Sequence, residues 1–224
     1  MPMNENMKIK PVKGKERIPF HCQLCGACCR HVEDSIMLEP MDIYRLSRFL
    51  REQGEAIEGP EDLLAQYTHP DMLADRLPIF LLNTDGPENA CVFLKNGRCS
   101  VYEARPRVCR MYPFTVVPGD QDRDFLYCLC TERPHHFMGG TVFVKDWFYE
   151  NFPLDARSFL KEDFESLPTL GKNAVAMGER RLKGLMFQFL FYRYYNYDLD
   201  KPFLPQFHAN TEELKRLTAV PEGG

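Results

Sequence analysis

The stretch "HCQLCGACCRH", residues 21–31, concentrates four of the chain's nine cysteines, at Cys22, Cys25, Cys28 and Cys29. Two residues separate the first three cysteines from one another, and this spacing lets two thiolates reach one metal whose metal–sulfur bonds are about 2.3 Å long. Gly26 can adopt a positive φ that turns backbone amides toward sulfur. The stretch therefore predicts a loop that wraps around a metal.

Cys29 differs because it directly follows Cys28, and neighbouring side chains diverge. It is expected to face a second metal, another atom of one cluster, or no metal. Cys91 and Cys99 flank an Asn-Gly turn, which predicts a hairpin that brings their thiols together across a strand pair. The candidate ligands are all nine cysteines: Cys22, Cys25, Cys28, Cys29, Cys91, Cys99, Cys109, Cys128 and Cys130.

Arginines surround Cys109 in "RPRVCR" at Arg105, Arg107 and Arg110. Cations at these positions would offset the negative charge of a site with several thiolates. The same residues could equally be ordinary surface arginines, and the sequence leaves both readings open.

The remaining candidates are weaker. Cys128 and Cys130 lie in the apolar run "FLYCLC", where each is as compatible with core packing as with metal binding. His21 and His31 bracket the first loop and could ligate or hydrogen-bond, although solvated loop histidines are the expected interpretation. The histidine pair at 135–136 receives no role.

The chain's composition excludes several classes of function. It has 224 residues, 44% hydrophobic residues and a net charge of −4, so it lacks the basic excess of proteins that bind nucleic acid. Its apolar runs are shorter than the ~20 residues that span a bilayer, and no signal peptide is recognisable at the N-terminus. We expect a cytoplasmic protein with no membrane partner, and in that reducing compartment clustered cysteines favour metal over disulfides.

The fold expected from these patterns is α+β, an α-rich irregular domain organised around a cysteine metal cluster and finished by C-terminal helices. Predicted boundaries are a flexible arm at 1–17, a metal-binding domain at 18–144 and a helical extension packed on it at 145–224. Apolar periodicity and end signals predict helices over 39–54, 59–69, 153–167 and 172–198, and strands over 79–83, 91–94, 113–117 and 140–145. The aromatic end of the last helix is expected to be core, and could cover the cluster.

Two blocks, "CQLCGACC" and "CVFLKNGRCSVYEARPRVCRMYPF", together resemble the YkgJ-type cysteine-cluster family, also called the CxxCxxCC zinc- or iron-chelating domain. The resemblance covers roughly residues 20–135. It implies that the first seven cysteines stand at the family's cysteine positions, and that either Cys128 or Cys130 is an eighth. Further matches to the motif, which would shape the loop around the site, are Arg105, Pro106, Arg110, Tyr112 and Pro113.

Three functions are compatible with this resemblance. The first is a protein that binds zinc or iron, with a [4Fe-4S] cluster as one form, and that has a redox, metal-handling or maturation role. The second is a metal-dependent enzyme, because flagellin lysine N-methylase has a similar cysteine motif and acts on a protein substrate. The third is an interaction module with a structural metal. The spacing CxxCGxC followed by distant cysteines is more typical of iron–sulfur ligation than of two separated zinc pairs.

Overall fold

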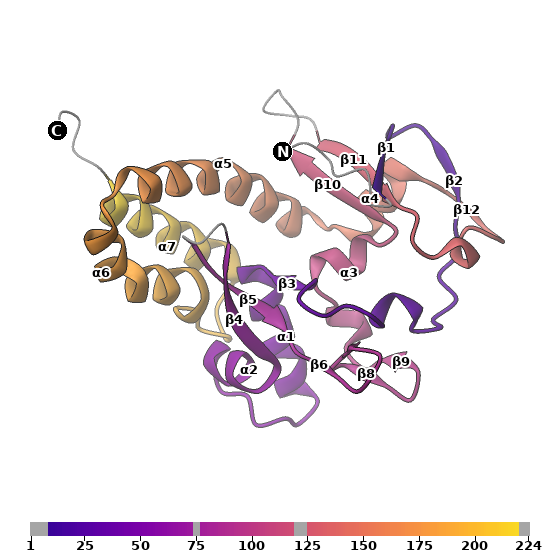
Figure 1. Cartoon of the computed structure of the whole chain (residues 1–224), viewed down its shortest axis with the longest axis horizontal. Coiled ribbons are helices and arrows are strands. Elements are labelled where there is room, and N and C mark those ends of the chain that lie inside the picture. The colour runs from indigo at the N-terminus through magenta and orange to yellow at the C-terminus, as the bar shows by residue number, and fades with distance from the viewer. Residues whose placement is uncertain (1–8, 74–76, 119–124, 220–224) are drawn as a thin grey trace.

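The computed structural model describes residues 9–73, 77–118 and 125–219, in which short antiparallel strands and helices are followed by a wholly helical C-terminal part (Figure 1). The expected α+β class is confirmed. The α-helices are α1 (Pro40–Glu52), α2 (Pro60–Tyr67), α3 (Arg107–Met111), α4 (Val144–Asn151), α5 (Leu154–Ala176), α6 (Glu179–Leu190) and α7 (Phe203–Thr218).

Helix α1 confirms the first predicted helix. Pro40 occupies the first helical position, where its missing N–H costs nothing. Glu39 precedes it in an extended conformation, and its backbone N–H donates to Asp42 Oδ2 over 3.3 Å. Ile43 and Leu46 are fully buried on the inner face. The carboxylates of Glu39 and Asp42 at the start of this helix also accept hydrogen bonds from Arg107 in the cysteine region.

The strands form five small antiparallel sheets among the described residues. Two sheets have three strands, in the orders β1-β11-β10 and β3-β5-β4, and the other pairs are β2 with β12, β6 with β7, and β8 with β9. Their bounds are β1 (Ile9–Val12), β2 (Arg17–Pro19), β3 (Met37–Leu38), β4 (Thr68–Leu73), β5 (Leu77–Leu82), β6 (Thr84–Asp85), β7 (Ala90–Cys91), β8 (Leu94–Lys95), β9 (Arg98–Cys99), β10 (Phe114–Pro118), β11 (Phe125–Cys130) and β12 (Thr141–Phe143).

Strand β1 and the start of β2 lie within the expected N-terminal arm. Residues 9–12 pair with β11, and residues 17–19 pair with β12. Residues 1–8 lie outside the described part of the chain.

The predicted strand over 91–94 is interrupted in the structure. Strand β7 ends at Cys91 and β8 begins at Leu94, with a turn at Val92 and Phe93. Phe93 is buried, and its ring lies 4.9 Å from that of Tyr67. The run is apolar because Phe93 belongs to the core, although its backbone turns there.

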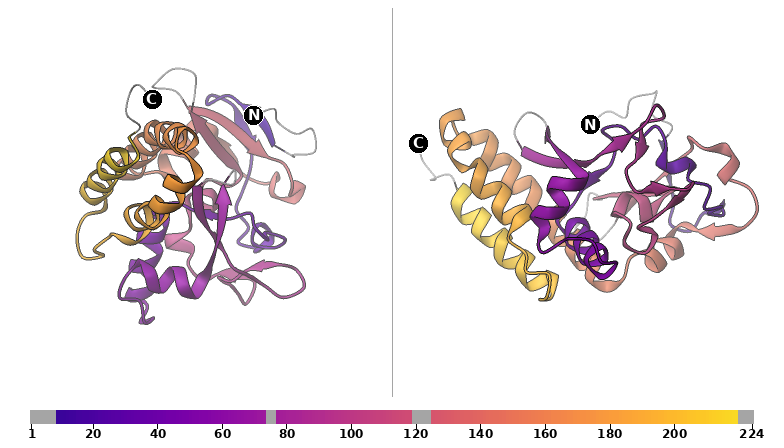
Figure 2. Two further views of the ribbon diagram at one scale, coloured as in Figure 1. Left: turned by 60° about the vertical axis from the view of Figure 1, so that its left-hand side comes forward. Right: turned by 90° about the horizontal axis from the view of Figure 1, so that it is seen from below.

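The C-terminal helices pack together as a layer beside the strands (Figure 2). Phe159 of α5 and Phe207 of α7 meet edge to face, with ring centroids 4.8 Å apart. A π-helical segment, Phe191–Tyr195, directly continues α6 and carries Arg193, which pairs with Asp163 in the interior at 2.9 Å. Burial alone would lower the pKa of Arg193, because it disfavours the charged guanidinium. The negative charge of Asp163, together with the hydrogen bonds to Asp163 and Tyr194, has the larger effect and raises this pKa. The predicted helical character of the aromatic stretch is confirmed.

One hydrophobic cluster joins the cysteine region to the C-terminal helices. It contains Val101 and Met111 from the former and Phe159 and Phe207 from the latter. No helix in the described ranges 9–73, 77–118 and 125–219 is long and apolar enough to cross a membrane.

Candidate metal centre

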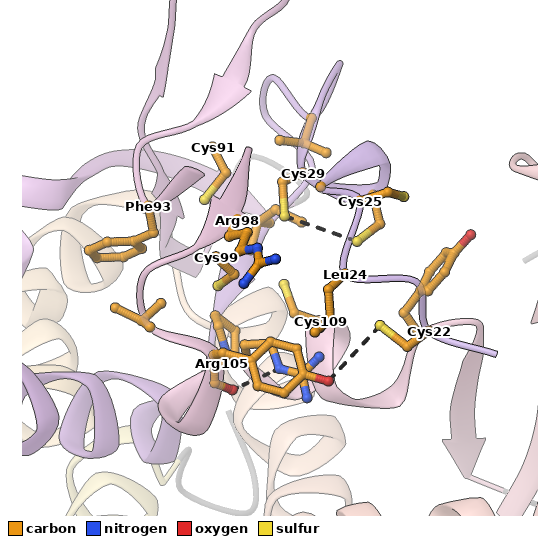
Figure 3. A pocket seen from close by; sticks show the side chains of 18 of the residues that line it. Cys22, Leu24, Cys25, Cys29, Cys91, Phe93, Arg98, Cys99, Arg105 and Cys109 are labelled. Atoms are coloured by element: carbon orange, nitrogen blue, oxygen red, sulfur yellow. Dashed lines mark hydrogen bonds between the residues drawn. The ribbon is translucent and has the colours of Figure 1, made fainter. Parts of the chain in front are cut away.

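Seven of the nine cysteines line one cavity of about 330 Å³. They come from three segments that are distant in sequence: the loop after β2, the short strands β7 and β9, and helix α3. In Figure 3 the side chains of Cys29, Cys91, Cys99 and Cys109 are directed into one space from these different segments. The complete set is Cys22, Cys25, Cys28, Cys29, Cys91, Cys99 and Cys109.

Gly26 sets the path of the first cysteine loop. Its φ is +69°, as the sequence predicts, and the 3₁₀-helix η1 (Ala27–Cys29) follows it. A Cβ atom at this position would lie 2.7 Å from the carbonyl oxygen of Gly97 and 2.8 Å from Cδ1 of Leu94. Only glycine therefore allows the loop to pack this closely against the β8–β9 hairpin.

The β8–β9 hairpin confirms the predicted Asn-Gly turn. Lys95 and Arg98 pair across it, and Asn96 and Gly97 between them have φ values of +50° and +75°. Two consecutive positive φ values are the signature of a type I′ turn, whose twist matches that of the flanking strands.

The expected pairing of Cys91 with Cys99 across this hairpin is wrong. Cys99 lies opposite Leu94, whereas Cys91 belongs to β7 and lies opposite Thr84 in a separate sheet. The turn at residues 92–93 separates the two strands. Both thiols nevertheless reach the cavity.

Helix α3 presents Cys109 and is fixed to the start of α1 by an ionic clamp. Arg107 Nε donates to both carboxylate oxygens of Glu39 over 2.8 Å, and the Arg107 backbone N–H donates to Asp42 Oδ1 over 2.8 Å. Burial, aided by the nearby Glu39 charge, raises the pKa of Asp42 to about 7. The clamp positions the helix through carboxylates that lie beneath it.

The arginines around Cys109 therefore divide into two roles. Arg107 is bound to the carboxylates, and Arg110 lies 4.0 Å from Asp42 Oδ1 with its guanidinium over the Phe152 ring. Burial lowers the pKa of Arg110 to about 10. Both side chains anchor α3, and neither is among the described residues that line the cavity.

Arg105 is the arginine of this motif that lines the cavity, together with Arg98 of β9. Its guanidinium stacks 3.5 Å above the Tyr102 ring, and its Nε donates to the Tyr102 carbonyl over 2.8 Å. The Tyr102 hydroxyl in turn points at Cys22 Sγ, 4.0 Å away, as the dashed line in Figure 3 marks. The motif residues thus shape one wall of the cavity and bring positive charge to it.

Cys28 and Cys29 both face the cavity despite being adjacent. Their sulfur atoms lie 4.0 Å apart, because η1 turns both side chains to one side. A hydrogen bond from the Cys29 thiol lowers the pKa of Cys28 to about 7, with smaller contributions from Arg105 and Arg133. The same bond raises the pKa of Cys29. Cys28 is therefore the member of the pair that ionises more readily.

Three further cavity thiols favour the protonated form in the absence of a metal ion. Burial raises the pKa values of Cys91, Cys99 and Cys109, and the negative charges of neighbouring thiolates raise them further. Metal ions supply the positive charge that such a set needs in order to ionise.

Cys128 and Cys130 lie outside this cavity among the described cysteines. Both are on β11, where Cys128 is buried opposite Thr115, and the Cys130 N–H donates to the Pro113 carbonyl over 2.8 Å. The C-terminal helices do not cover the site either, because the described lining residues run from Phe20 to His136. The expectation that the aromatic helix shields the cluster is therefore wrong.

Cys25 lies next to His135 and His136, two histidines for which the sequence pattern predicts no role. Its Sγ is 3.2 Å from His136 Nε2 and 3.8 Å from His135 Nε2, and the three ligand atoms lie within 4.8 Å of one another. Burial and the nearby positive charges of His135 and Arg133 lower the pKa of His136. His21 and His31, in contrast, are exposed, in keeping with loop histidines.

One of the comparisons with known proteins identifies the family of the chain. No protein of curated function and no solved structure matches the chain significantly. The family model CxxCxxCC, described as a "putative zinc- or iron-chelating domain", matches residues 21–133, which include all the cavity cysteines. Since the match spans half of the sequence, the chain belongs to the CxxCxxCC family.

Proposed function

We propose that the cavity binds a polynuclear, thiolate-ligated metal centre, and that this centre is an iron–sulfur cluster. The observation that supports the proposal is the convergence of seven cysteines on one cavity of about 330 Å³. A mononuclear tetrahedral zinc site uses at most four thiolates. Such a site would leave several half-buried thiols without a metal.

The chemistry of the lining fits a multiply charged thiolate centre. Arg98 and Arg105 bring positive charge to the cavity, and apolar side chains such as Ile36 and Val101 make up much of the remaining wall. Low polarity and compensating cations are among the features that tune iron–sulfur centres. The thiols at the three segments would hold the centre, and when bound it would supply one-electron redox chemistry.

Protein purified without air tests this proposal. Iron and acid-labile sulfide should be present in comparable amounts, and a broad visible absorption should bleach reversibly on reduction. Cys109→Ala should lose iron and colour, whereas Cys128→Ala removes a cysteine outside the cavity and should keep both. A colourless protein that holds only zinc, or equal iron loss in the two variants, would contradict the proposal.

The same experiment separates a redox role from a structural one. A cluster that serves electron transfer or metal handling should change oxidation state while the chain stays folded. If reduction leaves the spectrum unchanged and only chelation unfolds the chain, the centre is a structural element.

A further inference from the structure

We infer that Cys25, His135 and His136 form a second, mononuclear metal site for a zinc-class divalent ion at the rim of the cysteine cavity. This inference goes beyond the proposed function, since it assigns the two histidines and removes Cys25 from the ligands of the polynuclear centre.

The distances within this group suit one tetrahedral ion. Bond lengths of about 2.3 Å to sulfur and about 2.0–2.1 Å to nitrogen place sulfur and nitrogen roughly 3.6 Å apart around a tetrahedral metal. The distances from Cys25 Sγ, 3.2 Å to His136 and 3.8 Å to His135, bracket that value. All three ligand atoms lie within 4.8 Å of one another, so rotations of the side chains can bring them to one ion.

The imidazole of His136 is oriented for ligation. Its Nδ1 lies 2.8 Å from the Tyr112 hydroxyl, which leaves Nε2 facing Cys25. Metal-binding histidines commonly donate their second ring N–H to such an oxygen, which fixes the tautomer and the ring plane. The Phe20 ring packs edge-on against both His136 and Tyr112, at centroid distances of 6.5 and 6.1 Å. The group is thus held before any metal arrives.

Backbone contacts tie the histidine segment to the first cysteine loop. The His21 N–H donates to the His136 carbonyl over 3.3 Å, and Gln23 Nε2 donates to the His135 carbonyl over 3.1 Å. The 3₁₀-helix η3 (Pro134–His136) places the two histidines side by side, with ring centroids 4.2 Å apart. These ties hold ligands from two distant parts of the chain in register.

The site has an open side. Cys25 and His135 are exposed, whereas His136 is buried. Three protein ligands leave the fourth position of a tetrahedral ion to water or to a donor from another molecule. One thiolate with two imidazoles is a borderline donor set that suits zinc or cobalt better than a hard cation. The arrangement corresponds to zinc sites that keep an exchangeable position.

His135→Ala in the full-length protein tests the site, because the side chain is exposed and its removal should not unfold the chain. The native protein, purified without air and saturated with Zn²⁺, should contain one zinc per chain more than the variant. Iron content and the visible spectrum should be the same in both. His21→Ala, which removes an exposed imidazole outside the group, should leave the zinc count unchanged. Circular dichroism confirms that all variants are folded.

Two further measurements sharpen the test. Co²⁺ added to the native chain should give a sulfur-to-cobalt charge-transfer band that is absent from His135→Ala and retained in His21→Ala. Tyr112→Phe should keep the zinc site but weaken its affinity about 10–100-fold, which is typical of losing the partner of a metal-bound histidine.

An unchanged zinc count in His135→Ala would overturn the inference. Loss of both zinc and iron in that variant would also overturn it, because the residues would then belong to one joint centre. Absence of iron from the native protein, combined with the loss of one zinc in His135→Ala, would refute only the proposed iron–sulfur cluster.

Discussion

Replacing Gly26 with alanine should damage the cavity from a position that carries no ligand. The φ of +69° costs a non-glycine residue about 1–2 kcal/mol. The new Cβ would also lie 2.7 Å from the backbone oxygen of Gly97 and 2.8 Å from Leu94. A backbone oxygen in a tight hairpin cannot rotate away, and overpacking of this kind typically adds about 1–3 kcal/mol. The total expected loss of unfolding free energy is about 2–5 kcal/mol.

Gly54→Ala is the matched control for this substitution. Gly54 has a φ of +88°, but a Cβ there would meet nothing within 4 Å. It should therefore lose only the conformational part, about 1–2 kcal/mol. The difference between the two variants isolates the contact between the first cysteine loop and the hairpin.

Urea denaturation of both variants, with metal content measured in parallel, provides the assay. With a slope of about 2–3 kcal/mol per molar urea, the extra clash of about 1–3 kcal/mol in Gly26→Ala should lower its midpoint below that of Gly54→Ala by roughly 0.3–1.5 M. Gly26→Ala should also retain less metal. Equal midpoints and equal metal retention would show that the loop does not depend on this close approach.

Other predictions follow from the charges around the site. Glu39→Gln should lower the free energy of unfolding, measured by urea denaturation, by about 3 kcal/mol or more, because the guanidinium of Arg107 loses the carboxylate that it binds. Asp200→Asn, which breaks an exposed ion pair with Arg51, should lower it by less than about 1 kcal/mol. Similar losses in the two variants would contradict the role of the clamp. In metal-free protein, iodoacetamide should modify Cys28 before Cys109, and the rate at Cys28 should rise through pH 7. The reaction at Cys109 should stay slow until much higher pH. Peptide mass spectrometry that found the reverse order would refute this prediction. Metal binding should release protons and weaken as pH falls, since the buried thiols must ionise, and a pH-independent affinity in competition titrations would contradict the raised pKa values.

Local signals in the sequence predict much of the fold around the cavity. Gly26 and the Asn-Gly turn have conformations that only a few residue types favour, and the structure adopts both. Pro40 likewise marks the first turn of α1. These features depend on neighbours in the chain, so spacing and residue type are sufficient to find them.

The parts that the sequence did not predict depend on contacts between distant segments. His135 reaches Cys25 across a separation of 110 residues, and the ties that align them come from the pairing of β2 with β12 and from Gln23. A pair of histidines after a proline gives no sign of such a partner. Similarly, the sequence shows that Arg107 lies near Cys109. Only the packing of α3 on α1 shows that the Arg107 guanidinium pairs with the Glu39 carboxylate.

Because the cavity thiols come from three distant segments, a metal centre that joins them would lower the conformational entropy of the unfolded chain. A centre bound by Cys29 and Cys91 at once would act as a covalent staple that closes a loop of about 60 residues, and the chain-entropy account gives such a closure a value of ~4 kcal/mol. The strands that otherwise align these segments, β6 to β9, have only two residues each. Much of the order in residues 84–99 would then be supplied by inorganic bonds, so that loading the metal and completing the tertiary structure would be a single event.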